Sequence, residues 1–178
     1  MPALFDEVEV EIVQLLASPQ HRYEGRPSDG PVASSGYELR ESIELRAGLG
    51  IVGDRYFNQR AHRASSVSIQ SAEALDHVAA ELGIDVPGLP QTRRNILLRG
   101  VDVDALAGTV FSLDSGGGAI RFADARPANP CAWMDVAIAP GAHKALRRRG
   151  GLRTGPLDDG TLRLGPALLR IDPAGAGD

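Results

Sequence analysis

Short apolar stretches, many alternating with polar residues and each bounded by Gly, Pro, Asn or Asp, recur along the chain and constrain its fold more than any other feature. Such stretches are typical of β-strands. A chain with 21 Gly and 12 Pro in 178 residues has enough turn formers to connect many short strands. We expect strands at residues 8–13, 39–47, 67–70, 95–99, 110–113, 120–125, 162–164 and 168–171. The sequence therefore predicts a mainly β fold of the α+β class.

Two regions indicate helices. Residues 72–82 carry an apolar stripe at helical spacing, with Ser71 as a candidate N-cap and Gly83 as a terminating residue. A second helical region is expected over residues 130–149, interrupted at Pro140. With so few helices there is no regular strand–helix alternation, so we predict a β-barrel with two or three short helices rather than a doubly wound sheet.

The segments between these elements are rich in turn formers. Residues 18–36 form a long loop, which either covers a pocket or projects from the fold. The glycine run 116–118 and residues 157–161 each predict a hairpin turn. Neither a repeat nor a clear boundary divides the chain. We expect one domain over residues 1–172 and a disordered tail at 173–178.

Charge and hydropathy exclude several classes of protein. The net charge is −4, which does not favour generic binding to nucleic acid. The N-terminus opens acidic, and no stretch reaches the ~18 consecutive apolar residues of a membrane span. We therefore expect a cytoplasmic protein with neither a membrane nor a nucleic-acid partner.

Cys131 is the single cysteine, so neither a disulfide within the chain nor a cysteine-rich zinc site can form. Asn129 and Pro130 before it are residues favoured at a helix start. This pattern predicts Cys131 in a first helical turn, close to Arg126, where the helix dipole and a guanidinium stabilise a thiolate. The alternative is a buried cysteine that fills apolar space.

The cationic residues are almost all arginine, and two stretches are enriched in them. Residues 136–157 contain no acidic residue but include Lys144, Arg147, Arg148, Arg149 and Arg153. Arg93, Arg94 and Asn95 stand at the start of an expected strand. Guanidinium groups bind phosphate and carboxylate in a planar fork. Arg93, Arg94, Asn95 and Arg149 are therefore candidates for binding an anion, against the alternative of solvated surface charge.

Residues 50–56 lack the spacing of a phosphate-binding loop. Their glycines suit a turn, and Asp54 is a candidate for an internal pair with an arginine. The four histidines show no ligand spacing, which argues against a zinc site.

Taken together, these runs resemble the MOSC domain family, named after the C-terminal part of molybdenum cofactor sulfurase. The matching runs, in order, are Gly50 to Arg55, Ser68 to Glu73, Arg93 to Ile96, Gly100 to Asp102 with Leu106 and Gly108, Arg126 to Cys131, Arg149 to Gly151, and Asp159 to Thr161 with Gly165.

The resemblance implies a β-barrel similar to the barrel domain of pyruvate kinase, and binding of the molybdenum cofactor. It implies that Cys131 carries persulfide sulfur or ligates molybdenum. It implies that Arg93 and Asn95 hold the phosphate and pterin, with Arg126 and Asn129 lining the same pocket.

Two departures from the family pattern stand out. Ala128 occupies a position where some members have a second cysteine, which argues against a dithiol mechanism, and Gly165 is followed by Pro166 rather than Asp. Lys144 is the only lysine and lacks the context of a Schiff-base site, so the pyridoxal phosphate chemistry of full-length sulfurases is not expected here.

Several functions stay open at this point. A cofactor-binding module could pass sulfur through Cys131, using a sulfur-donor protein. It could instead reduce N-hydroxylated compounds with a redox partner. A cysteine hydrolase or transferase would need a histidine base, with His143 the closest in sequence. A non-enzymatic binding domain would leave Cys131 buried.

Overall fold

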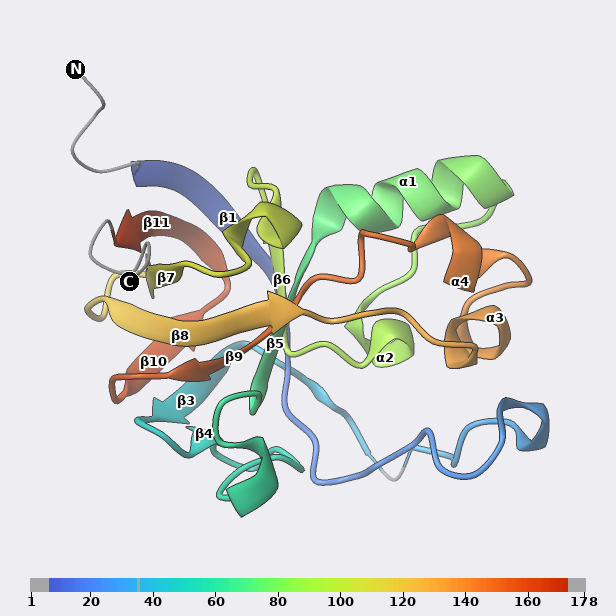
Figure 1. Ribbon diagram of the computed structural model, residues 1–178, viewed down its shortest axis with the longest axis horizontal. Helices are drawn as coiled ribbons and strands as arrows, with labels where there is room; N and C mark the ends of the chain where they lie inside the picture. The colour runs from blue at the N-terminus through green and yellow to red at the C-terminus, as the bar shows by residue number, and fades with distance from the viewer. Residues whose placement is uncertain (1–6, 35, 173–178) are drawn as a thin grey trace.

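The first and last strands pair with each other and close a barrel. In the computed structural model, which describes residues 7–34 and 36–172, β1 (Glu7–Leu16) lies antiparallel to β11 (Gly165–Asp172) (Figure 1). From β11 the barrel continues through β7 (Val110–Asp114), β8 (Ile120–Pro127), β9 (Leu152–Pro156), β5 (Val67–Ser71) and β6 (Ile96–Arg99), which pairs with β1. Seven strands thus form a closed ring, and the predicted β-barrel is confirmed.

Four further strands lie beside the barrel. The two-residue strand β2 (Leu39–Arg40) pairs with the end of β1, and a separate sheet has the order β10 (Gly160–Arg163), β3 (Ser42–Arg46), β4 (Gly50–Ile51). The glycine run 116–118 does join an antiparallel pair, β7 and β8. The turn at 157–161 does not make a hairpin, because it connects β9 in the barrel to β10, which pairs with β3 instead.

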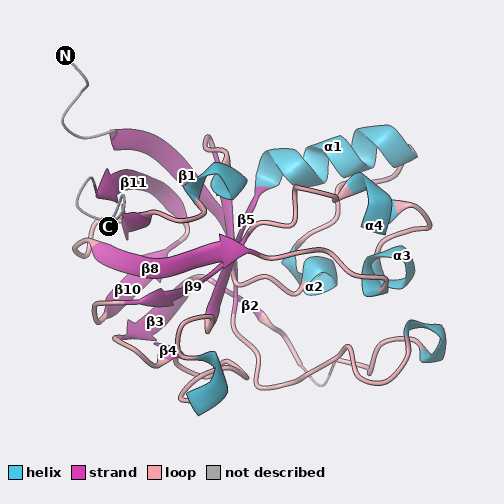
Figure 2. Ribbon diagram, in the orientation of Figure 1, coloured by secondary structure: helices cyan, strands magenta, loops and turns pink. Residues whose placement is uncertain are grey.

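The described chain contains four α-helices, gathered at one end of the barrel (Figure 2). These are α1 (Ala72–Leu82), α2 (Leu89–Thr92), α3 (Trp133–Ala137) and α4 (Ala142–Ala145). α1 begins and ends where the sequence predicts, with Gly83 in the left-handed conformation at φ 64°. α1 and α2 connect β5 to β6, the only parallel pair in the described sheets, which needs such a crossover. α2 falls in a proline-rich stretch where a loop is expected.

Two apolar cores divide the molecule. The barrel interior is filled by side chains, among them Phe111 and Phe122, whose rings stack at 5.4 Å across β7 and β8. A second core lies between the strands and the helices, where Leu16, Leu97 and Trp133 meet α1 and α4. Because the interior of the barrel is filled, a ligand site has to lie outside it.

The predicted tail, 173–178, lies outside the described residues, and the single domain over 1–172 stays a prediction. No α-helix in the described ranges has the length and apolar character needed to cross a bilayer.

A double glycine lets three segments approach closely at the helical end of the barrel. A Cβ on Gly150 would lie 2.0 Å from the carbonyl oxygen of Ala128, and a Cβ on Gly151 would lie 2.0 Å from that of Ile69. The amide of Ala128 donates to the Gly151 carbonyl at 2.8 Å. These glycines therefore hold the segment that leads to Cys131 against the barrel.

This close approach predicts a large difference between two glycine substitutions. Gly53 and Gly151 share a φ of +83°, but nothing lies within 4 Å of a Cβ at Gly53. Gly53→Ala should cost about 1–2 kcal/mol from the left-handed backbone alone. Gly151→Ala should cost roughly 2–5 kcal/mol, because the clash with the Ile69 carbonyl adds to it. Denaturant unfolding measures both, and equal losses would contradict the close approach.

Candidate functional site

A cavity of about 260 Å³ lies at the helical end of the barrel, next to the β1–β2 loop (residues 17–34 and 36–38). Its walls come from that loop, from residues 55–68, from the start of β6, from the segment before α3 and from β9. Its lining includes no carboxylate among the residues that the structure describes, but it includes five arginines: Arg22, Arg55, Arg93, Arg94 and Arg153. The cavity is therefore strongly cationic.

The buried carboxylate of Asp54 holds the floor of this cavity together. Its Oδ1 accepts hydrogen bonds from the Ser18 amide at 3.1 Å, the Asn95 side chain at 3.2 Å and Arg55 at 3.3 Å. Its Oδ2 accepts one from the Tyr56 amide at 3.2 Å. The predicted internal pair of Asp54 with an arginine is confirmed, and the partner is Arg55.

Asn95 lines the cavity, but its side-chain amide is fully used within the protein. Its Oδ1 accepts from the amide and the hydroxyl of Ser68, at 3.0 and 3.1 Å. Its Nδ2 donates to the Leu16 carbonyl at 3.1 Å and to Asp54. A primary amide has two donors and two acceptor positions, so none is left for a pterin. Asn95 joins β1, β5 and the Asp54 loop instead.

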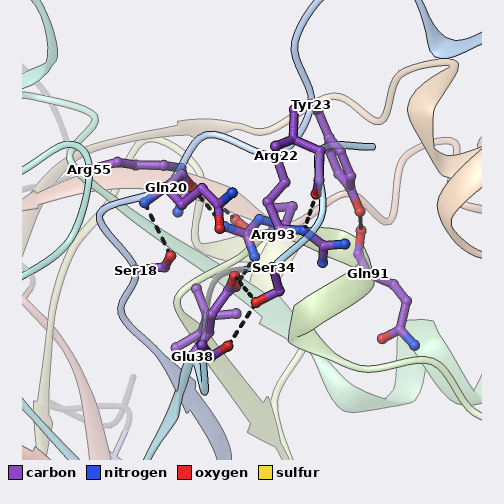
Figure 3. Close-up of polar contacts among 12 residues, drawn as sticks. Ser18, Gln20, Arg22, Tyr23, Ser34, Glu38, Arg55, Gln91 and Arg93 are labelled. Atoms are coloured by element: carbon purple, nitrogen blue, oxygen red, sulfur yellow. Dashed lines mark hydrogen bonds and ion pairs between the residues drawn. The ribbon is translucent and has the colours of Figure 1, made fainter. Parts of the chain in front are cut away.

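Arg93 lies at the C-terminus of α2 in the left-handed conformation, with φ 61°. Its guanidinium forms a buried ion pair with Glu38 and donates to the Gln20 carbonyl at 3.0 Å (Figure 3). Burial lowers the pKa of Arg93, and the hydrogen bond to Glu38 opposes that shift. Because Glu38 neutralises this cation, Arg93 serves first to fix the β1–β2 loop.

Arg94 has no such carboxylate partner. Its Nε donates to the Gly150 carbonyl at 3.0 Å and its Nη2 to the Ala128 carbonyl at 3.1 Å. Carbonyl oxygens satisfy hydrogen bonds but do not neutralise the charge. Burial lowers the pKa of Arg94 to about 10, and the positive charge of Arg153 adds to the shift. A desolvated cation beside a second cation creates a favourable site for an anion.

Arg153 and Thr92 make the cavity still more favourable for binding an anion. Within residues 7–34 and 36–172, the Arg153 guanidinium forms neither a hydrogen bond nor an ion pair. Thr92 is only 3% exposed, and its hydroxyl has no hydrogen-bond partner among the same residues. Both residues line the cavity. An unpaired buried hydroxyl costs about 1–3 kcal/mol, which a ligand could recover.

Cys131 is exposed and lines the same cavity, so its sulfur is accessible. The predicted helix start is wrong: α3 begins at Trp133 with Ala132 as its N-cap, and Asn129 caps no helix. The Cys131 carbonyl accepts the Met134 amide at 3.0 Å, so the cysteine opens a turn before a five-residue helix. Its cationic surroundings come from arginine side chains and not from a helix dipole.

Aromatic side chains tie the β1–β2 loop to the Cys131 segment. The rings of Tyr23 and Trp133 stack with centroids 5.0 Å apart and an angle of 11° between their planes. The Tyr23 hydroxyl donates to the Gln91 carbonyl (Figure 3). Burial raises the pKa of Tyr23 to about 12, against the opposing charge of Arg93. The loop is therefore held over the cavity and does not project freely.

The structure separates the residues that the sequence groups together. Arg93, Arg94, Asn95, Asn129 and Cys131 line one cavity. Arg126 and Arg149 do not belong to it: both are exposed, and each borders a different hollow. The expectation that Arg126 lines the Cys131 pocket is therefore corrected, because closeness along the chain does not bring its side chain to that cavity. Arg149, a candidate for binding an anion, lies outside the cavity as well.

Other lining residues were not selected from the sequence. His21, Arg22 and Tyr23 lie in a loop whose position depends on long-range contacts with Asp54, Arg93 and Trp133. The sequence does point to Arg153 as a candidate for binding an anion, since it belongs to the cationic stretch without acidic residues. Nothing in the sequence distinguishes it from Arg149, which the fold turns elsewhere.

The sulfur of Cys131 has no hydrogen bond to an imidazole among the described residues. His143 borders a neighbouring hollow and does not line the Cys131 cavity. His21 does line that cavity, but its imidazole is not hydrogen-bonded to the Cys131 sulfur, so the described residues contain no preformed cysteine–histidine pair of the kind that a hydrolase uses. The exposure of Cys131 also contradicts its interpretation as a buried filler.

Comparison with known proteins finds a family model that matches most of the chain. The family model described as the MOSC domain matches residues 54–169, a range that includes Asp54, Arg94, Cys131 and Arg153. No curated protein matches the chain.

Solved structures share the fold at low sequence identity. The YUAD protein from Bacillus subtilis superposes with a TM-score of 0.71 at 15% identity, covering 94% of this chain and 98% of that one. YiiM from Escherichia coli gives 0.55 at 14%, covering 93% and 69%, and YiiM from Geobacillus stearothermophilus gives 0.59 at 13%, covering 92% and 75%. Identities this low support the fold and leave the chemistry to the residues themselves.

The buried Arg93–Glu38 pair predicts strong coupling between the two residues. Glu38→Ala leaves a buried guanidinium without its carboxylate and should cost about 3–5 kcal/mol of stability. The double variant with Arg93→Met should lose less than the sum of the two single losses, because it removes both charges. Denaturant unfolding of the four proteins measures this coupling, and additive losses would show that the pair does not fix the loop.

Proposed function

Because this chain belongs to the MOSC domain family, we propose that its arginine-lined cavity binds the molybdenum cofactor in the cytoplasm. In this proposal Cys131 either carries persulfide sulfur to the cofactor or ligates its metal. The observation that carries it is the uncompensated charge of Arg94 and Arg153 in the same cavity as an accessible thiol.

The residues present fit the chemistry of that cofactor. Its phosphate is an anion, and guanidinium groups bind phosphate through charge-assisted, often bidentate, hydrogen bonds. The Thr92 hydroxyl offers a further buried donor without a partner among the described residues. A thiolate is a soft ligand that suits molybdenum or sulfane sulfur, and Cys131 is accessible to either.

The roles differ from those that the family resemblance alone implies. Arg94 and Arg153 would hold the anionic part of the cofactor, whereas Arg93 is already neutralised by Glu38 and Asn95 is saturated. The stacked rings of Tyr23 and Trp133 supply the aromatic part of the cavity lining, next to the Cys131 segment. When bound, the cofactor would supply the redox or sulfur chemistry of its molybdenum.

A second candidate function uses the same site. If the cofactor stays bound, the open position of Cys131 leaves room for a small substrate, and the protein would be a reductase of N-hydroxylated compounds served by a redox protein. If the cofactor is handed on, the protein is a sulfur carrier served by a sulfur-donor protein. Retained metal with turnover supports the reductase, and persulfide on Cys131 without retained metal supports the carrier.

Metal and phosphate analysis after anaerobic purification from a cofactor-competent host tests this proposal. We expect molybdenum and phosphate with the wild-type protein. Arg153→Gln should retain roughly tenfold to a hundredfold less of both, because a charge-assisted contact to phosphate is lost.

The matched control is Arg163→Gln, an exposed arginine on β10 outside the cavity, which should behave as the wild type. Loss of molybdenum in Cys131→Ala assigns the cysteine as metal ligand. An unchanged molybdenum content in Cys131→Ala, together with persulfide on Cys131 of the wild type, assigns it as carrier. A wild-type protein that retains neither molybdenum nor phosphate and carries no persulfide on Cys131 would overturn the proposal, as would an Arg153→Gln protein with unchanged content.

A further inference from the structure

We propose that the cavity also binds a small inorganic sulfane-sulfur anion of the thiosulfate class and that Cys131 takes its outer sulfur. This inference rests on the proposed function, since it uses the same cysteine as a sulfur carrier. It names the source of the sulfur as a small dianion that enters the cavity, in place of a protein donor.

The charge of the cavity favours a compact polyanion. Arg94 and Arg153 line it without a carboxylate partner, and burial has already lowered the pKa of Arg94. Arg22 also lines the cavity without a carboxylate partner among the described residues, so the three positive charges match the combined charge of −3 of the Cys131 thiolate and a dianion. The oxygen atoms of such an anion also match the forked donors of guanidinium groups.

The buried hydroxyl of Thr92 gives an independent indication of a ligand. Thr92 is 3% exposed and lines the cavity, and its Oγ1 has no partner among residues 7–34 and 36–172. A hydroxyl can donate to an anionic oxygen, so an oxyanion would supply the missing hydrogen bond.

The volume of the cavity also suits a small anion. At about 260 Å³ it lies just below the roughly 300–1,000 Å³ of pockets for drug-sized molecules. A water molecule takes about 30 Å³ in the liquid, so the cavity holds an anion of a few heavy atoms together with water. Since Cys131 and the two arginines line one cavity of this size, an anion bound to the guanidiniums lies close to the sulfur.

The surroundings of Cys131 fit this reaction better than acyl transfer. No imidazole donates a hydrogen bond to its sulfur in the described chain. Acyl transfer needs a general acid for its leaving group. Sulfite leaves as a stable anion and needs none, and the guanidiniums stabilise the negative charge that it takes away.

The transfer balances without an added oxidant or reductant. The Cys131 thiolate attacks the outer sulfur of thiosulfate, a sulfur–sulfur bond forms to Cys131, and the sulfur–sulfur bond of thiosulfate breaks. The electron pair of the broken bond leaves with sulfite, and the total charge of −3 is conserved from reactants to a Cys131 persulfide anion and sulfite. Cyanide can then remove the sulfur as thiocyanate and regenerate the thiolate, which provides a direct assay.

The experiment uses the full chain without molybdenum, with thiosulfate as donor and cyanide as acceptor. We expect thiocyanate to form and intact-mass analysis to show one added sulfur atom on Cys131 before cyanide is added. Arg153→Gln should raise the KM for thiosulfate roughly tenfold to a hundredfold with a smaller change in kcat, because it removes one charged contact to the anion. Thr92→Val, which keeps the shape of the side chain, should raise KM by a smaller factor.

Controls separate this site from general thiol reactivity. Arg163→Gln should keep the wild-type KM, Cys131→Ala should form no thiocyanate, and sulfate should compete with thiosulfate in the wild type but not detectably in Arg153→Gln. The inference is overturned if thiosulfate adds no sulfur to Cys131, if KM is unchanged in Arg153→Gln, or if sulfur arrives only from a cysteine desulfurase. Molybdenum binding with no thiosulfate activity would contradict this inference alone. Thiosulfate activity without molybdenum binding would contradict only the cofactor proposal.

Discussion

The buried carboxylate of Asp54 is the contact on which the rest of the site depends. At 6% exposure it cannot rely on water, and donors from three separate segments satisfy it: the β1–β2 loop just after β1, the residue before β6, and its own loop. Because an ionised carboxylate is costly to bury without such donors, these segments have few alternative positions. The lining arginines Arg55, Arg93 and Arg94 follow directly from these segments, so one acidic residue determines where several cations stand.

The cations around the cavity differ in how their charge is balanced. Arg93 has a carboxylate of its own and Arg55 shares that of Asp54, so both contribute mainly to architecture. Arg94 has only carbonyl partners, and Arg153 has no hydrogen-bond or ion-pair partner in the described chain. Arginines with a carboxylate partner therefore build the site, whereas those without one remain available to a ligand. Amino-acid composition alone does not tell the two groups apart.

The barrel could be predicted because its signals are local. Strand periodicity and the capping glycine of α1 depend on neighbouring residues, and the structure confirms both. The predicted helix start at Asn129 is wrong, although Asn129 and Pro130 are residues favoured at the start of a helix. The Ala128 carbonyl is held by Arg94 and its amide by Gly151, so the chain runs on beside the barrel to a turn at Cys131, and α3 begins only at Trp133. Tertiary hydrogen bonds overrode a local preference.

The site was predicted less completely than the fold, for the same reason. Cys131, Arg94 and Asn129 could be chosen as candidates from residue type and order, and they share a cavity. The β1–β2 loop lines the cavity because Glu38 forms an ion pair with Arg93, which is distant in sequence. No local sequence pattern predicts such a long-range contact. Arg149 and Arg153 are close in sequence and chemically identical, and only the path of the chain through Gly150 and Gly151 separates their environments.

Pairing of the first strand with the last has a consequence for synthesis on the ribosome. β1 is made first, but its partner β11 is made last, and until then β1 and β7 each have an unpaired edge. Exposed strand edges invite association with other chains. The ring therefore cannot close before residues 165–172 have left the ribosome, and until then two strand edges stay exposed on the growing chain.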